Sequence, residues 1–247
     1  SNLFADEWPM WGRDGTRNMV SNEKNIYFDF NPGEMSDDEI VDLKTTKNIK
    51  WVAKLGSQAY GNVTIGNGCV FVGTNNESPR DPGKKGDRGV VMCLDEKTGD
   101  LKWQLVIPKL GAGKVSDWEY IGICSSTAID GDKVYVVTNR CEVVCLDING
   151  LSDGNAGPFK DEASYIKPKG MKDELNEKLD ADIIWMYDMR DELGVFPHNV
   201  TSSSPVIVGD TVYIATSNGV DWSHTNKPSP LSPSWVALDK NSGELKG

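Results

Sequence analysis

The two histidines are the first residues to consider for chemistry. His198 lies in Val-Phe-Pro-His-Asn and His224 in Asp-Trp-Ser-His-Thr. Imidazole side chains bind metals and transfer protons near neutral pH, so the pair is a candidate metal or acid/base site. No His-Glu-x-x-His or Glu-x-x-His spacing accompanies them. The alternative is that each histidine hydrogen-bonds a carbonyl of its proline-rich loop, so the sequence identifies neither a metal nor a catalytic residue.

A second candidate combines carboxylates with aromatic rings. Asp117-Trp118-Glu119-Tyr120 places an acidic residue between two rings, and Asp221-Trp222 repeats part of that pattern. Such residues can stack a planar ligand and hold a cation with their carboxylates. The alternative is that these indoles fill a central channel of the fold.

The five cysteines do not have the spacing of a metal site. Their odd number leaves at least one of them free or paired with another chain. Cys141 and Cys145 lie four positions apart in a strand-like run, so they are roughly 13 Å apart and cannot form a disulfide there. No Cys–His spacing supports a nucleophilic cysteine, and a structural role is expected for them.

Bulk composition argues against nucleic acid as a partner and against a membrane-spanning segment. The 26 basic and 37 acidic residues give a net charge of −11, which disfavours nucleic acid because phosphate is repelled. No apolar run approaches the length of a membrane span.

The elements that position these residues come from an internal repeat. Three segments share one frame, in which the last apolar residue before a Gly/Asp/Asn turn precedes the next strand's valine by five positions: Ile65 and Val70, Ile129 and Val134, Ile207 and Val212. Short β-branched runs broken by such turns predict hairpins. Each repeat therefore predicts a four-stranded antiparallel sheet with strands A to D, and such sheets bury both faces by stacking around an axis.

The C–D turn carries the motif Leu-Asp-x-x-Thr/Ser-Gly, followed by a tryptophan. Asp95 and Asp239 can accept hydrogen bonds from the turn backbone, Gly99 and Gly243 supply a positive φ, and Trp103 is expected between neighbouring sheets. This motif resembles the repeat of the quinoprotein, or PQQ-repeat, β-propellers. Residues 8–15 and 49–55, which contain Trp8 and Trp51, also resemble the start of the exported bacterial members.

The expected fold is therefore all-β, a β-propeller of four-stranded antiparallel blades with about three blades present, part of a ring of seven or eight. Residues 1–47 form an N-terminal extension with a short helix that begins at Ser36, and 48–247 the partial propeller. The boundaries expected within the propeller are a closing strand at 48–55, blade 1 at about 56–107, blade 2 at about 121–188 with an insertion at 149–182, and blade 3 at about 200–247. Met171, Leu175 and Leu179 recur at helical spacing within the insertion, which predicts a second surface helix.

The repeat register also assigns the loops to two faces. The long B–C and D–A connections fall on one face, at 76–89, 106–123, 188–203 and 218–234, whereas the insertion at 149–182 falls on the other. Loops on a rigid scaffold usually carry function, so the first face is the expected binding face. The candidate ligand-binding residues on it are Trp118, Glu119, Tyr120, Asn139, Arg140, His198, Asp221, Trp222 and His224.

The resemblance implies two functions. The first is an exported or periplasmic scaffold that binds a protein or a small molecule through its loop-rich face, with the remaining propeller blades as a further partner, from a missing C-terminal segment or a second chain. The alternative is a PQQ-dependent oxidoreductase with PQQ and Ca²⁺ on the axis. The chain has no adjacent Cys-Cys pair, and its residues do not match the calcium-ligand and catalytic-aspartate motifs of the dehydrogenases one by one.

Overall fold

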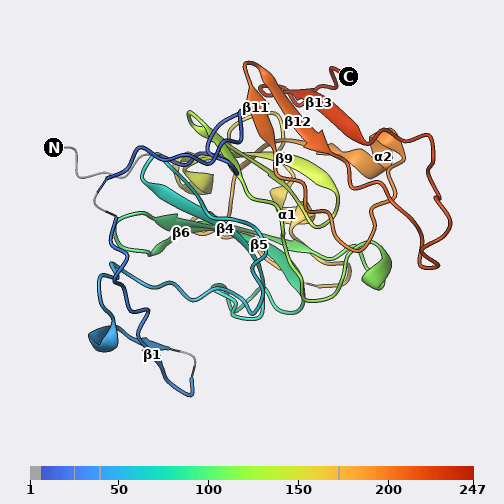
Figure 1. Cartoon of the computed structure of the whole chain (residues 1–247). Helices are drawn as coiled ribbons and strands as arrows, with labels where there is room; N and C mark the ends of the chain where they lie inside the picture. Colours follow the sequence, from blue (N-terminus) through green and yellow to red (C-terminus); the bar gives the residue numbers. More distant parts are fainter. Residues whose placement is uncertain (1–6, 25, 39, 172) are drawn as a thin grey trace.

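The repeats fold into three antiparallel β-sheets stacked as consecutive propeller blades, as a computed structural model shows (Figure 1). The structure describes residues 7–24, 26–38, 40–171 and 173–247. Hydrogen-bonded neighbours follow chain order within each blade, which confirms the predicted all-β class and the A-to-D order in blades 1 and 2, whereas blade 3 has strands A to C in the described residues. The strands are β3 (Thr64–Gly66), β4 (Cys69–Asn75), β5 (Arg88–Asp95) and β6 (Leu101–Pro108) in blade 1; β7 (Ala128–Asp130), β8 (Lys133–Val137), β9 (Glu142–Asp147) and β10 (Ile183–Asp188) in blade 2; and β11 (Val206–Val208), β12 (Thr211–Ala215) and β13 (Trp235–Asp239) in blade 3.

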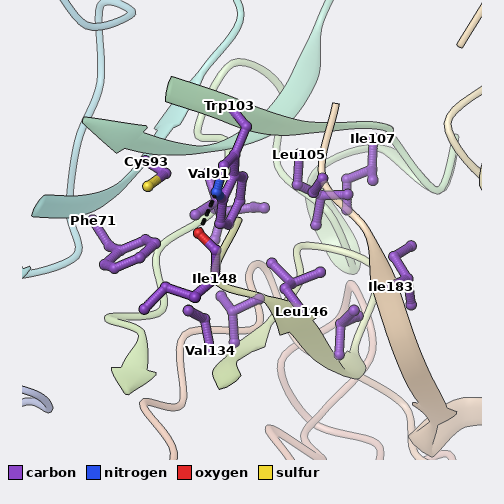
Figure 2. Packing of buried hydrophobic residues seen from close by; sticks show 14 of the residues in the cluster. Phe71, Val91, Cys93, Trp103, Leu105, Ile107, Val134, Leu146, Ile148 and Ile183 are labelled. Carbon is purple, nitrogen blue, oxygen red and sulfur yellow. Dashed lines mark hydrogen bonds between the residues drawn. The ribbon is translucent and has the colours of Figure 1, made fainter. Parts of the chain in front are cut away.

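Alternation along the strands places one apolar row of each blade against the next blade. Figure 2 shows Phe71, Val91 and Trp103 of blade 1 facing blade 2. A second core lies between blades 2 and 3, where Tyr135 and Trp185 pack with residues of β12 and β13. Because burial of large apolar side chains contributes about 1.5–3 kcal/mol each, these two interfaces hold the stack together.

The N-terminal residues cross the inner strands before they leave the blades. Trp8 pairs with Ile65 of β3, and the Pro9 carbonyl accepts the amide of Ile129 in β7 at 2.7 Å. The chain then forms a hairpin of β1 (Glu34–Met35) and β2 (Val41–Asp42), which projects from the blades in Figure 1. The prediction of a helix from Ser36 was wrong. Strands β1 and β2, which flank this segment, pair with each other, and only a 3-10 turn at Leu43–Thr45 follows. Glu39 of its expected cap lies outside the described residues.

The insertion of blade 2 also differs from expectation. Its helix is α1 (Glu162–Tyr165), and the segment with Met171, Leu175 and Leu179 forms no helix in the described residues. The chain there runs beside β6 instead, where Leu179 accepts the amide of Gln104 at 2.7 Å. Backbone pairing with an open strand edge replaces the helical hydrogen bonds that the spacing predicted.

The insertion is not confined to the face that the register predicted. It starts at the C–D turn of blade 2 and continues along the outer edge of blade 1. Asp180 pairs with Lys84 at 2.6 Å, and Tyr165 donates to Glu142 at 2.6 Å. Because Lys84 lies in the B–C loop of blade 1 and Glu142 opens strand C of blade 2, the insertion links the two faces.

Residues 48–55 pair with no strand in the described part of the chain, and their role as the closing strand of a last blade stays a prediction. Among them, Trp51, Ala53 and Leu55 still pack on the apolar face of blade 1. The remaining helix, α2 (Met189–Leu193), follows β10. No helix in the described part of the chain combines the length and apolar character needed to cross a bilayer.

Candidate functional site

The loops of the predicted binding face contact one another. The amide of Trp118, in the connection from blade 1 to blade 2, donates to Asn199 O at 2.8 Å. Asn199 lies in the next D–A connection, and its amide donates to Val115 O at 2.7 Å. The amide of His198 donates to Ser217 O, in the B–C loop of blade 3, at 3.3 Å. Backbone hydrogen bonds therefore join the D–A and B–C connections into one surface.

An apolar cavity lies where these connections meet. Its volume is about 360 Å³, and it is lined by Tyr60, Trp118, Ile121, Cys124, Asn199, Val200 and Ser202. Tyr60, Cys124 and Ser202 lie just before the inner strands β3, β7 and β11, so the cavity is on the inner side of all three blades. The Trp118 side chain is 39% exposed there, and its backbone carbonyl accepts from Lys109 Nζ at 2.8 Å. This arrangement presents an ordered aromatic surface to a ligand.

A second cavity of about 630 Å³ continues the first along the inner strands. The two cavities share Tyr60, Cys124 and Ser202. At its far end the Arg17 guanidinium lies 4.7 Å from the centre of the Trp11 ring and donates to Ser204 O at 3.2 Å. Partial burial lowers the pKa of Arg17. The result is a groove with serine hydroxyls along its wall and one stacked cation at its end.

The structure brings the two histidines together. The rings of His198 and His224 meet edge to face with centroids 4.9 Å apart. His198 Nδ1 lies 2.7 Å from Val220 O, and because a carbonyl only accepts, Nδ1 carries the proton. No group of three or more His, Cys, Asp or Glu side chains that could hold a metal occurs among the described residues. His198 thus bonds a loop carbonyl, but that carbonyl belongs to the B–C loop of blade 3 and not to its own D–A connection.

The acidic and aromatic candidates occupy separate positions on this face. The Asp221 carboxylate accepts from Ser223 Oγ at 2.5 Å and from Asn226 Nδ2 at 3.0 Å, and these hydrogen bonds lower its pKa. Trp222 is 66% exposed and lines neither inner cavity. Glu119 and Tyr120 are exposed beside Trp118, with the Tyr120 amide bound to Asp87 Oδ2 at 2.8 Å. Of the predicted aromatic residues, only Trp118 lines the inner cavity.

Asn139 and Arg140 support the loops and the insertion, although the register placed them near the axis. Asn139 is buried, and its Nδ2 donates to Asp117 Oδ2 at 2.8 Å. Burial raises the pKa of Asp117, although Lys109 forms an ion pair with it. The Arg140 guanidinium lies over the Tyr165 ring at 5.3 Å and pairs with Glu142 at 3.1 Å. Both side chains are thus engaged with protein groups: Asn139 with the D–A connection, and Arg140 with Glu142 of β9 and with Tyr165 of the insertion.

Several lining residues were not predicted from the sequence. Asn199 has a φ of 59°, which turns the D–A connection towards Trp118. Ser202, Ser203 and Ser204 directly precede strand β11, and all three line the inner groove. Their frame match with Cys124-Ser125-Ser126 was the available signal, since strand A is the inner strand of every blade.

Solved structures with similar folds are quinohemoprotein alcohol dehydrogenases. ADHIIG from Pseudomonas putida HK5 superposes with a TM-score of 0.52 at 16% identity, over 97% of this chain and 26% of that one. The enzyme from Comamonas testosteroni gives 0.52 at 13% identity, over 98% and 26%. BamB from Moraxella catarrhalis gives only 0.26 at 15% identity, over 76% and 60%. The chain thus spans about a quarter of the length of these dehydrogenases, and at this identity the likeness shows the fold alone.

Comparison by sequence is more specific about the family. No curated protein matches the chain. A family model matches residues 19–150, just over half of the chain, and is described as outer membrane protein assembly factor BamB. The repeat motif, the blades and this match agree: the chain belongs to the PQQ-repeat β-propeller family of the outer membrane protein assembly factor BamB.

Proposed function

We propose that this chain is part of a non-catalytic propeller that binds a protein or small-molecule ligand through its loop-rich face. The observation that carries the proposal is the cavity beside Trp118, where two D–A connections are hydrogen-bonded to each other around a half-exposed indole. Concave apolar sites with a few fixed polar groups are typical binding sites. Asn199 and Ser202 are the polar groups in this one.

The surroundings of the cavity favour a protein ligand. Tyr120 is 53% exposed and Trp222 66% exposed on the same face. Exposed aromatic residues are enriched where proteins bind each other, because they bury a large area with little loss of side-chain freedom. A peptide that inserts one apolar side chain beside Trp118 and contacts these outer rings fits this face.

The remaining parts of the proposal follow from the family. We place the protein outside the cytoplasm, in a bacterial periplasm or another exported location, and the blades in a ring of seven or eight. The outer face of blade 3 has the register of a blade interface, with Tyr213 43% exposed and Trp235 68% exposed. A further blade of the same repeat, from the same or another polypeptide, is the partner proposed for that face.

The alternative is a PQQ-dependent oxidoreductase, and the residues present do not fit that cofactor. Its carboxylates need cationic partners, and a Ca²⁺ beside it needs several oxygen ligands. No acidic side chain among the described residues lines the Trp118 cavity or the groove that continues it, although Arg17 lines that groove and the Lys114 ammonium lies 5.2 Å from the centre of the Trp118 ring. The nearby Asp117 is buried against Lys109 and Asn139, so its carboxylate is not available to hold Ca²⁺ there.

Photo-crosslinking tests the proposed face. A photoreactive phenylalanine is placed at Tyr120 or Trp222, and as the matched control at Asp132, which is exposed in the A–B turn on the opposite face. The variants are incubated with envelope extract, and crosslinked proteins are identified by mass spectrometry. We expect one discrete product from Tyr120 and Trp222 that unlabelled protein competes away, and none from Asp132.

A second set of measurements distinguishes specific binding at this site from nonspecific crosslinking and from the oxidoreductase alternative. Trp118→Ala should weaken binding about 5- to 30-fold if that indole supplies about 1–2 kcal/mol, and the crosslinking yield from position 222 at subsaturating protein should fall accordingly. Equal products from both faces, or no effect of Trp118→Ala, would contradict the proposal. Titration with PQQ and Ca²⁺, followed by alcohol-dependent dye reduction, would support the oxidoreductase if it gave saturable binding and turnover.

A further inference from the structure

Two cysteines and a lysine converge on adjacent strands of blade 1. Cys69 begins β4 opposite Asp95, and Cys93 lies in β5 opposite Phe71. Cys69 and Cys93 are therefore diagonal neighbours on one face of the sheet. Lys102, from β6, reaches across so that its Nζ lies 3.2 Å from Cys69 Sγ.

The two thiols share a buried site between blades 1 and 2. Cys69 is 1% exposed and Cys93 0%, and both belong to one buried cluster with residues of blade 2. The hydrogen bond from Cys93, together with the Lys102 ammonium, lowers the pKa of Cys69 to about 6, although burial and the Asp95 carboxylate act against this. The same contact and burial raise the pKa of Cys93. One thiol is thus prepared as a thiolate and its neighbour stays protonated.

The repeat supplies an internal comparison. Cys145 occupies in blade 2 the register position that Cys93 occupies in blade 1, but Lys133 stands where Cys69 would be. Burial raises the pKa of Cys145. Burial also raises the pKa of Cys124 to about 11 and that of Cys141 to about 12. Of the five thiols, Cys69 is the one whose pKa is lowered, and its sulfur lies beside the Lys102 ammonium, which favours the nucleophilic thiolate.

We propose that Cys69 and Cys93 are a peroxide-reactive dithiol, with Cys69 as the attacking thiol and Cys93 as the resolving one. The Cys69 thiolate attacks one oxygen of a hydroperoxide, the O–O bond breaks, and the sulfur is oxidised to a sulfenic acid. The released oxygen takes a proton and leaves as water or alcohol. The Cys93 sulfur then attacks the Cys69 sulfur, and the hydroxyl leaves with the Cys93 proton as water.

The location suits a small oxidant. Cys69 directly follows the exposed turn Asn67–Gly68, so a short opening of this turn admits a peroxide without unfolding the blade. The disulfide would join β4 to β5 beside Trp103, the cross-strand partner of Cys93 in β6. Formation of this disulfide would therefore crosslink two strands of blade 1 at its contact with blade 2.

The test uses the full chain under native conditions. Hydrogen peroxide is added, and intact mass and peptide mapping follow the products. We expect the loss of two hydrogen atoms and one crosslinked peptide pair containing Cys69 and Cys93. In Cys93→Ser the sulfenic acid on Cys69 should persist and be trapped by dimedone. Cys145→Ser, at the matched position of blade 2, should behave as the wild type.

A second readout keeps the proposal testable if a serine variant folds poorly. Native alkylation with iodoacetamide should modify Cys69 faster than the other four cysteines at neutral pH. Lys102→Gln should slow that reaction at least about twofold at neutral pH and by much less at alkaline pH, because loss of the ammonium raises the pKa of Cys69 and each unit by which that pKa exceeds the working pH lowers the thiolate fraction tenfold. Equal reactivity of all five cysteines, or oxidation that yields no Cys69–Cys93 peptide, would overturn the proposal.

Discussion

The indole ring of Trp51 lies directly over Gly99, where an added β-carbon would come within 2.6 Å of the ring. The Trp51 Nε1 donates to Glu96 O, in the same C–D turn, at 3.0 Å. The same arrangement recurs on the next two blades: Trp103 over Gly150 with Nε1 bound to Ile148 O at 2.7 Å, and Trp185 over Gly243 with Nε1 bound to Lys240 O at 3.1 Å. Each blade therefore receives an indole from the preceding element, and Trp51 does for blade 1 what Trp103 does for blade 2.

This contact predicts a difference between two glycines of blade 1. Gly99 has a φ of 77° and Gly68 a φ of 71°, but nothing lies near a β-carbon built at Gly68. Both alanine variants bear the cost of a left-handed residue, about 1–2 kcal/mol. Gly99→Ala should lose about 1–3 kcal/mol more, because its methyl group displaces Trp51. Urea unfolding measures both free energies, and equal losses would show that the indole does not rest on the turn.

A second prediction compares the buried interface between blades 2 and 3 with the exposed outer face of blade 3. Tyr135 of blade 2 is fully buried against blade 3, and its hydroxyl donates to Lys240 O at 3.0 Å. Tyr213 occupies the same register position in blade 3 and is 43% exposed. Tyr135→Ala should destabilise the chain by about 3–5 kcal/mol and Tyr213→Ala by under about 1 kcal/mol. A large loss for Tyr213→Ala would mean that a further blade or another partner covers this face in solution.

Features that recur in every blade were predictable from the sequence, whereas features that occur once, such as the path of the insertion, were not. The five-residue offset and the Gly99 turn recur in register, so comparing copies was enough to order the strands. The path of the insertion depends on single long-range ion pairs, such as Arg88 with Asp173, which no periodicity connects. The contact of Arg140 with Tyr165 was not predictable for the same reason, since Tyr165 comes from that insertion. Trp118 lines the inner cavity from a D–A connection that the repeat register assigned to the loop-rich face.

The insertion should contribute stability through a buried charge. Lys84 is 1% exposed and pairs with Asp180 at 2.6 Å and with Asp81 at 3.0 Å. Asp180→Asn removes the more buried partner and should cost about 3 kcal/mol, because the ammonium is then only partly compensated. Asp29→Asn, in an exposed pair with Lys47, should cost under about 1 kcal/mol. Thermal unfolding at low salt compares them, and similar losses would show that the insertion does not depend on this pair.

A final prediction concerns pH and the buried carboxyl group of Asp182. Its Oδ2 accepts from Ala156 N at 2.6 Å, whereas Oδ1 has no hydrogen-bond partner. Burial raises the pKa of Asp182 from 3.8 to about 6, so the folded state holds this proton more tightly than the unfolded state. Its contribution to stability therefore falls as pH rises from about 4 to about 6 and stays low above that range. Asp182→Asn cannot ionise and should gain stability relative to the wild type across this window.

The matched control has the opposite sign. Hydrogen bonds from Lys246 and from the amides of the C–D turn lower the pKa of Asp239 to about 2, so its ionised form stabilises the folded state at neutral pH. Asp239→Asn should therefore be less stable than the wild type at neutral pH, with a difference that shrinks as pH falls below about 4. Melting temperatures of the wild type and both variants between about pH 3 and pH 8 test this pair. If the Asp182→Asn difference stays constant over that range, the buried carboxyl group does not titrate with the raised pKa.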